Sequence, residues 1–132
     1  VVTVTSDEVV EMAAFHMYFH DLDALPVVDG QGELIGIVTQ NDVFRALVTL
    51  MGLRAKGTRI TLDVPDEKGV LAKVAGVVRD AGVNISSLST YGNPTSGRAT
   101  VILRVKTEKV QELVEALNRE KFKVVHVSEV WN

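Results

Sequence analysis

The sequence predicts an α+β protein in two parts, a small α/β unit followed by a ferredoxin-like βαββαβ domain. Several short runs alternate apolar and polar residues with a period of two, which is typical of strands, and other runs repeat apolar residues at helical spacing. A stretch with two glycines and no periodicity, residues 52–57, separates two different orders of these elements. The resulting parts are residues 1–52, a linker at 53–58, and residues 59–132.

Composition excludes several classes of protein. The 132 residues are 46% hydrophobic and 23% charged, carry a net charge of −3 and include no cysteine. Without cysteine there is no disulfide scaffold, thiolate zinc site or cysteine nucleophile. The negative charge offers no general attraction to nucleic acid or an acidic bilayer, and no apolar run approaches the roughly 18 residues of a membrane span. We therefore expect a cytoplasmic protein with no nucleic-acid or membrane partner.

The first part opens with a strand-like run at residues 1–4, which has no Met, so we expect that earlier residues are missing. Ser6 or Asp7 is then predicted to cap a helix that continues to about His20. Residues 25–28 form a short buried strand, and the glycines of residues 29–32 favour a hairpin turn.

Residues 34–38 are the return strand of this hairpin. A second helix is predicted to start at residues 39–42, which have the spacing of a capping box, and Val43, Leu47 and Leu50 would share one face of it. A unit of about 50 residues buries too little apolar surface to be stable alone. A second copy, in a preceding segment or another subunit, is the simplest cover for its remaining apolar residues, namely Phe15, Phe19, Val27, Ile35, Ile37 and Phe44.

The second part begins with a strand at residues 59–64, whose alternate residues are apolar. Asp66 is predicted to cap a helix from about Gly69 to Ala81, and Gly82 to end it. The helix has an apolar stripe at Leu71, Val74 and Val78.

The remaining elements of the second part complete the βαββαβ order. Strands are predicted at residues 83–91 and 98–106, separated by a loop at 92–97. A helix follows from about Glu108 to Arg119, and the last strand covers Phe122 to about Val127. This order indicates one antiparallel sheet with both helices on one face.

Residues 24–28 and 29–42, Ala-Leu-Pro-Val-Val and Asp-Gly-Gln-Gly-Glu-Leu-Ile-Gly-Ile-Val-Thr-Gln-Asn-Asp, resemble the cystathionine-β-synthase (CBS) motif. The resemblance covers residues 1 to about 50. It implies a cleft between paired motifs that binds an adenosine-containing ligand such as AMP, ATP or S-adenosylmethionine. The nucleotide-binding residues that it implies are Thr5, Ala24, Leu25, Pro26, Gly36, Thr39, Asn41 and Asp42.

The chemistry of these residues agrees with such a ligand. The Thr39 hydroxyl and the helix N-terminus offer donors to a phosphate, and the Asp42 carboxylate can accept from ribose hydroxyls. Gly36 lets a ligand approach the backbone, and Arg45 could supply a cation. The alternative is that Thr39 and Asp42 only cap the helix and no ligand binds.

Residues 66–85, Asp-Glu-Lys-Gly-Val-Leu-Ala-Lys-Val-Ala-Gly-Val-Val-Arg-Asp-Ala-Gly-Val-Asn-Ile, resemble the opening of an ACT domain, and the resemblance continues to about Val130. It implies a dimer that binds an amino acid at its interface. The contact residues that it implies are Asp66, Gly69, Leu71, Asn84 and Ile85. Backbone N–H groups at Gly69 would meet a carboxylate, and Asn84 can donate and accept. Alternatively, Gly69 and Gly82 only shape turns and Asn84 satisfies nearby backbone.

The combination of a CBS motif, a short linker and an ACT domain resembles the carboxy-terminal two-thirds of the acetoin utilization protein B family. That family has two CBS motifs ahead of the ACT domain, so the resemblance implies that one is missing here.

Other sites are not favoured by the sequence. His16 and His20, with Asp21 and Asp23 after them, have a spacing that a metal site could use, but histidines at a helix end or interface are the favoured interpretation. The strand at residues 98–105 lacks the aromatic residues with which RNA-recognition sheets stack bases. No G-x-S-x-G elbow, P-loop or nucleophile beside a base is found, so an enzyme is not expected.

We therefore expect a non-catalytic regulatory sensor of small molecules. It would bind an adenine nucleotide in the first part and, as a further expectation, an amino acid in the second. The competing interpretation is a structural dimerisation or interaction module whose two sites are empty. The expected partners are a second copy of the chain, as a homodimer or larger oligomer, and a regulated target protein.

Overall fold

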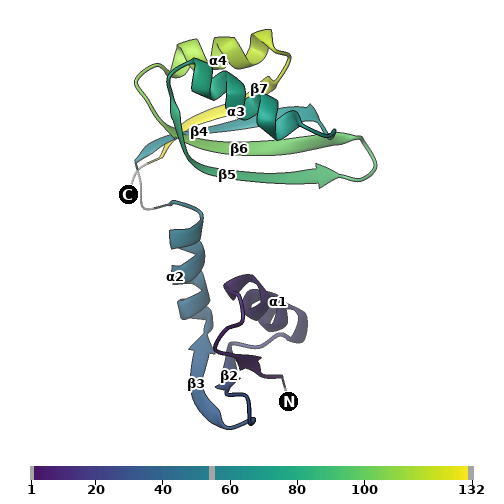
Figure 1. Ribbon diagram of the computed structural model, residues 1–132, viewed down its shortest axis with the longest axis vertical. Helices are drawn as coiled ribbons and strands as arrows, with labels where there is room; N and C mark the ends of the chain where they lie inside the picture. Colours follow the sequence, from purple (N-terminus) through teal and green to yellow (C-terminus); the bar gives the residue numbers. More distant parts are fainter. Residues whose placement is uncertain (1, 54–55, 131–132) are drawn as a thin grey trace. The chain divides into compact units, whose positions relative to one another are not determined.

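The computed structural model describes residues 2–53 and 56–130, which form two compact units, residues 1–50 and 51–132 (Figure 1). No helix among these described residues is long and apolar enough to cross a bilayer. Each unit is described by itself below.

The first unit is a three-stranded sheet with two helices. Its elements are β1 (Val4–Thr5), α1 (Val10–His20), β2 (Ala24–Val28), β3 (Leu34–Thr39) and α2 (Gln40–Leu50). The strand order is β1-β2-β3, in which β1 pairs parallel with β2 and β2 pairs antiparallel with β3. The predicted hairpin is confirmed, since the Asp29 carboxylate accepts from the backbone N–H groups of Gln31 and Glu33 in the turn.

The start of this unit differs from the prediction. The first strand comprises only Val4 and Thr5, and α1 begins at Val10, with Val9 as an N-cap that makes no side-chain hydrogen bond. The Asp7 carboxylate accepts from the Thr5 hydroxyl at 2.6 Å instead. This local bond satisfies Asp7 before the helix begins, so neither Ser6 nor Asp7 caps α1.

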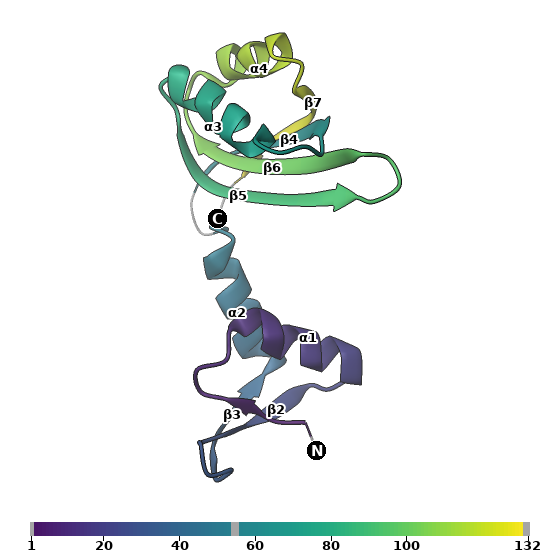
Figure 2. The same ribbon diagram turned by 45° about the vertical axis from the view of Figure 1, so that its right-hand side comes forward.

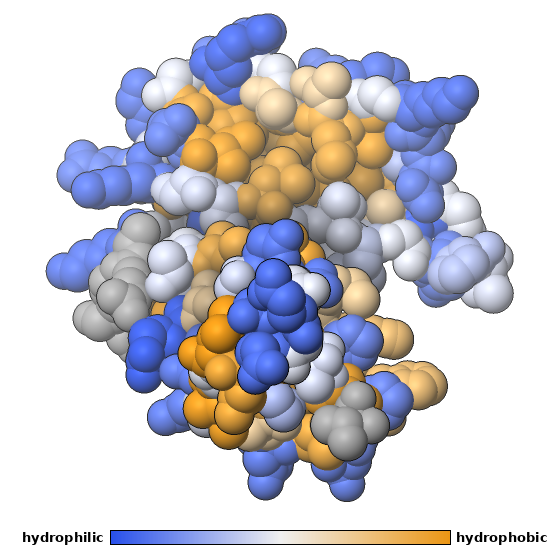
Figure 3. Space-filling view, turned by 60° about the horizontal axis from the view of Figure 1, so that its bottom comes forward, coloured by the Kyte–Doolittle hydropathy of each residue, from blue (hydrophilic) through white to orange (hydrophobic). Residues whose placement is uncertain are grey.

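The core of the first unit is small. It consists of Val4, Ala13, Met17, Leu25 and Val43. Val27 and Leu47 pack against this core, whereas Leu50 is exposed and does not share the buried face of α2 as predicted. Apolar side chains reach the surface on the face shown in Figure 3. Five of the residues predicted to need cover are exposed by 45–69%, namely Phe15, Phe19, Ile35, Ile37 and Phe44.

The second unit is a four-stranded antiparallel sheet with two helices. Its elements are β4 (Gly57–Pro65), α3 (Val70–Asp80), β5 (Asn84–Asn93), β6 (Arg98–Lys106), α4 (Val110–Arg119) and β7 (Lys123–Val130). The strand order is β5-β6-β4-β7, and both helices cover the same face of the sheet in two views (Figures 1 and 2). The predicted ferredoxin-like fold is confirmed.

The core of the second unit lies between the sheet and the helices. Alternate residues of β4 and β6 are buried against α3 and α4, as the alternation predicts. These inward residues are Ile60, Leu62, Val64, Ala99, Val101, Leu103 and Val105. The stripe of α3 is centred on Val70, Val74 and Val78, with Leu71 half-buried beside it.

Several predicted boundaries in the second unit were wrong. Gly57 and Thr58, assigned to the linker, lie in β4, while Arg54 and Ala55 lie outside the described residues. The strand β5 continues to Asn93, so Gly92 is in a strand and not in a loop. Asp66 does not cap α3, because Gly69 is the N-cap, with a φ of 83° and no side-chain hydrogen bond.

Candidate functional site

The N-terminus of α2 is closed by a capping box, as the sequence predicts. The Asp42 Oδ2 atom accepts from the Thr39 backbone N–H at 2.8 Å and from the Thr39 hydroxyl at 2.9 Å. In return, the Asp42 backbone N–H donates to the Thr39 Oγ1 at 3.3 Å. The bond from the Thr39 backbone N–H is the main reason that the pKa of the Asp42 carboxyl lies below its usual range, and the bond from the Thr39 hydroxyl is the second. Burial raises this pKa by less than these two bonds lower it, and the Arg45 charge lowers it slightly further.

These bonds change the roles available to the two side chains. The Thr39 hydroxyl has one proton, which it donates to Asp42, so in this arrangement it has no proton to offer a phosphate. The Asp42 Oδ1 atom, 3.8 Å from an Arg45 guanidinium nitrogen, is the acceptor that remains. The expectation that Asp42 accepts from hydroxyls is thus compatible with its capping role.

The structure brings some of the predicted nucleotide-binding residues together. Ala24 pairs with Thr39 across the hairpin, so it lies at the same end as Asn41 and Asp42 in the first turn of α2. Pro26 pairs with Ile37, and Gly36 pairs with Val27 further along the hairpin.

Two predicted nucleotide-binding residues are poorly placed. Thr5 pairs with Val28, four residues along β2 from Ala24, which is about 13 Å in an extended strand. The Leu25 side chain is fully buried in the core and cannot touch a ligand. The prediction therefore fails for the Leu25 side chain, and Thr5 lies away from the Thr39 end.

A cavity between α1 and α2 was not predicted. Its volume is about 650 Å³, and its lining residues are Ala14, Met17, Tyr18, Phe19, Asp21, Gln40, Val43 and Phe44. Tyr18 and Phe19 are among the most exposed apolar side chains of the unit. Two adjacent aromatic residues near the end of an apolar helix were the feature of the sequence that could have indicated this cavity.

In the second unit, Asp66 lies against β5. Its backbone N–H donates to the Gly97 carbonyl at 2.9 Å, and a Cβ on Gly92 would lie 2.6 Å from the Asp66 Oδ2 atom. Gly69 follows in the left-handed conformation at the start of α3, and Leu71 is half-buried against the core. Gly92 therefore belongs to this site, and its position inside a strand pattern is the signal that could have identified it.

Asn84 and Ile85 lie at the other end of the sheet. Asn84 pairs with Lys106 of β6, whereas Pro65, which precedes Asp66, pairs with Arg98 of the same strand. Eight residues separate Arg98 from Lys106, or about 26 Å. Within one chain, the structure does not bring the two groups of predicted amino-acid contacts together.

The histidines of α1 take part in aromatic packing. The His16 and His20 rings are stacked with centroids 6.1 Å apart, and each also contacts a phenylalanine ring. Across residues 2–53 and 56–130, no three His, Asp or Glu side chains gather into a possible metal site.

Comparison with known proteins identifies both units. The family model described as TTHA0829-like ACT domain matches residues 56–128, and the CBS domain model matches residues 1–49. Among solved structures, the regulatory subunit of aspartate kinase from Thermus thermophilus is 25% identical with a TM-score of 0.47, over 55% of this chain and 50% of that one. The acetolactate synthase small subunit from Thermotoga maritima is 28% identical with a TM-score of 0.45, over 57% of this chain and 47% of that one. This chain thus matches about half the length of each protein.

Proposed function

Because the chain belongs to the TTHA0829-like ACT domain family and carries a CBS domain ahead of that domain, we propose that it is a non-catalytic regulatory protein that senses small molecules. The observation that carries the proposal is the separation of Asp66 and Gly69 from Asn84 and Ile85 on one sheet with a free edge. Contact residues that are separated in this way form a site when a second copy supplies the missing half.

The free edge is β5, which among the described residues pairs only with β6, while Gly52 lies against Ser87 near one end of the strand. If two copies pair antiparallel through β5 about its midpoint, near Leu88 and Ser89, Asn84 of one copy lies opposite Asn93 of the other. Asn93 follows Gly92, against which the Asp66 carboxylate lies. A two-fold dimer of this kind forms two identical sites from the two separated halves, and it also satisfies the unpaired backbone groups of the edge.

The groups at this junction suit an amino acid. The N-terminus of α3 follows a glycine, and the Leu71 and Ala72 backbone N–H groups have no acceptor within the described residues, so they can receive a carboxylate. The exposed Asp66 carboxylate can accept from an ammonium group, and Asn84 can donate and accept. We propose a free amino acid as the ligand of the ACT domain.

For the CBS domain we propose an adenosine-containing ligand, such as AMP, ATP or S-adenosylmethionine, at the Thr39–Asp42 end of the hairpin. The Asp42 Oδ1 atom is available to accept from ribose hydroxyls, and Arg45 lies beside it to offset phosphate charge. The Phe19, Ile37 and Phe44 side chains are exposed in a single copy, which supports a second CBS motif that covers them and completes the cleft. That motif belongs to a second copy or to a further segment, as in the acetoin utilization protein B family.

Ligand binding that differs between oligomeric states would shift the population of those states, and a regulated target protein could respond to the shift. Self-association is thus part of the proposed mechanism.

A thermal-shift screen tests the proposal. The wild-type chain and Asp42→Ala are heated with AMP, ATP, S-adenosylmethionine and each common amino acid, because a ligand at 100 times its Kd stabilises the folded state by about 2.7 kcal/mol. We expect one adenosine ligand to raise the Tm of the wild type but not of Asp42→Ala, and one amino acid to raise both. No response to either class would leave the chain as a structural dimerisation module.

A further inference from the structure

A row of four polar side chains crosses the second sheet on the face that the helices do not cover. In the register of the sheet, Ser87 of β5 pairs with Arg104 of β6, Arg104 with Arg59 of β4, and Arg59 with Ser128 of β7. Side chains of directly paired residues lie on the same face of a sheet. The neighbouring Ile60 is buried on the helix side, so the row lies on the opposite side of the sheet. Gly52 lies against the Ser87 side chain at one end of the row, where a Cβ on Gly52 would be 3.3 Å from the Ser87 Cβ atom.

The two arginines of this row have no carboxylate partner among the described residues. The Arg59 guanidinium donates to the Thr61 hydroxyl at 2.8 Å, and the Arg104 Nη1 atom is buried with no hydrogen-bond partner. Asp63, four residues along β4 from Arg59, is already paired with Arg98 at 3.1 Å. The row therefore holds two uncompensated positive charges.

This arrangement is costly without a ligand. Like charges at directly paired positions of a sheet repel each other. A buried donor without an acceptor loses its hydrogen bonds to water and gains no bond in exchange, which destabilises the fold. An oxyanion between the two guanidinium groups removes both costs. Two arginine charges match a phosphate dianion, and the Ser87 and Ser128 hydroxyls at the ends of the row can donate to its remaining oxygens.

We propose that the face of the ACT sheet opposite the helices binds a phosphate group at Arg59 and Arg104. The site is separate from the amino-acid and adenosine sites proposed above and does not depend on them. Free phosphate and a phosphate monoester present the same dianion, so either can supply the group.

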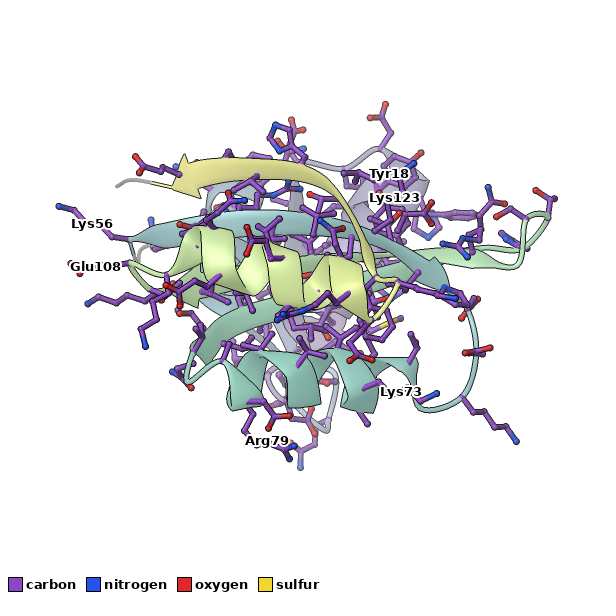
Figure 4. All side chains as sticks on the ribbon, turned by 90° about the horizontal axis from the view of Figure 1, so that it is seen from above. Tyr18, Lys56, Lys73, Arg79, Glu108 and Lys123 are labelled. Atoms are coloured by element: carbon purple, nitrogen blue, oxygen red, sulfur yellow. The ribbon has the colours of Figure 1, made fainter. Side chains whose placement is uncertain are left out.

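The end of the sheet next to this row does not attract an anion by itself. A cavity of about 550 Å³ there carries two lysines, Lys56 and Lys106, and two glutamates, Glu108 and Glu129. Lys56 and Glu108 lie at the same end of the unit (Figure 4). Because the cavity is lined by two charges of each sign, it adds no net positive charge beside the arginine row.

The test compares Arg104→Met with Arg98→Met in the full chain. Methionine keeps much of the apolar stem and removes the charge, and Arg98 lies on the same strand but is paired with Asp63. The Tm is measured with inorganic phosphate, phenyl phosphate and sodium acetate at matched ionic strength. Affinity for the phosphate probes should fall about 10- to 100-fold in Arg104→Met, the loss expected for a charged hydrogen bond, and stay unchanged in Arg98→Met.

The two probes identify the source of the phosphate. A response to both supports binding of monoesters as well as free phosphate, and a response to inorganic phosphate alone supports free phosphate. Arg104→Met without any anion should unfold at a higher temperature than the wild type, because it removes the repulsion and the unpaired donor. Arg59→Gln, on the neighbouring strand, provides the same phosphate test should Arg104→Met not fold.

Three results would overturn the proposal. The first is a wild-type Tm that does not respond to phosphate, and the second is a response of equal size to acetate. The third is a phosphate response that Arg104→Met and Arg59→Gln both retain.

Discussion

The Asp66 carboxylate lies against the backbone of Gly92, so closely that a Cβ on Gly92 would sit 2.6 Å from the Asp66 Oδ2 atom. Glycine at this position of β5 is therefore what allows a carboxylate from the loop after β4 to rest on the edge strand. The contact places a charged group at the end of the strand that we propose to be the dimer edge.

Gly92→Ala should abolish the amino-acid response and leave the fold nearly intact. The obstructed atom is the end of a flexible side chain, so Asp66 can turn away and the free energy of unfolding should change by less than about 1 kcal/mol. Gly76→Ala is the matched control, because its Cβ meets only an Arg79 guanidinium nitrogen at 3.6 Å. Because Gly76 lies within α3, Gly76→Ala should raise the free energy of unfolding by up to about 1 kcal/mol and should keep the response to the amino acid. Calorimetry with the responding amino acid would refute the role of Asp66 if Gly92→Ala bound it normally.

Gly69→Val and Gly32→Val should be destabilised alike but differ in ligand binding. The two glycines have φ values of 83° and 81°, and no atom lies within 4 Å of either Cβ position. Valine at a positive φ should cost about 1–2 kcal/mol in each unit, measured by chemical denaturation. Only Gly69→Val should lose the amino-acid response, because its Cβ obstructs the approach to the α3 N-terminus. Equal ligand responses in both variants would mean that Gly69 is a turn residue only.

Asp42 should make the first unit less stable in acid. Its pKa is lowered in the folded chain, chiefly by the Thr39 backbone N–H, so its contribution to stability is present above the unfolded pKa of about 3.9 and is lost as the pH falls through the lower folded value. Asp42→Asn keeps a capping oxygen without the charge. Denaturation of both chains should show the wild type more stable at about pH 6 and a difference that vanishes at about pH 2. If the wild type were still more stable than Asp42→Asn at about pH 2, the stabilisation would not come from the ionised Asp42 carboxylate.

The apolar face of the first unit should mediate self-association. Phe19 and Phe44 are exposed by 69% and 59%, more than a stable monomer of this size is expected to leave uncovered. Light scattering should show a dimer or larger oligomer for the wild type. On dilution, the double variant Phe19→Glu with Phe44→Glu should dissociate at a higher concentration than the wild type, because only the β5 edge of the second unit still joins its copies. The control is Val127→Glu, on the β7 edge of the other unit and 41% exposed, which should not change the mass. A wild-type monomer at micromolar concentration would contradict the prediction.

Local signals allowed much of this fold to be predicted. The alternation around Ile60 and Leu103 predicted the sheet faces, and the spacing of Thr39 and Asp42 predicted a capping box that depends on residues three apart. The start of α1 was missed because the Thr5 hydroxyl competes for the Asp7 carboxylate, a choice between two local bonds that spacing does not decide.

The sites were harder to predict because they depend on strand register. The sequence indicates that Asp66 follows one strand and that Asn84 begins another. Only the pairing of these strands with β6 shows that the two residues lie at opposite ends of the sheet. The pairing of Arg59 with Arg104 is likewise a contact between residues 45 positions apart, which no local pattern specifies.

The central claim, that the amino-acid site is shared between two copies, is tested most directly by mixing two inactive variants. Asp66→Ala and Asn84→Ala change exposed side chains, so each should fold, and each alone should lose amino-acid binding. In a mixed dimer, one site combines both defects, and the other has an intact Asp66 from one copy and an intact Asn84 from its partner. Random assortment after co-refolding should therefore restore about a quarter of the wild-type binding sites in calorimetry. A mixture that binds no more amino acid than the separate variants would contradict the account.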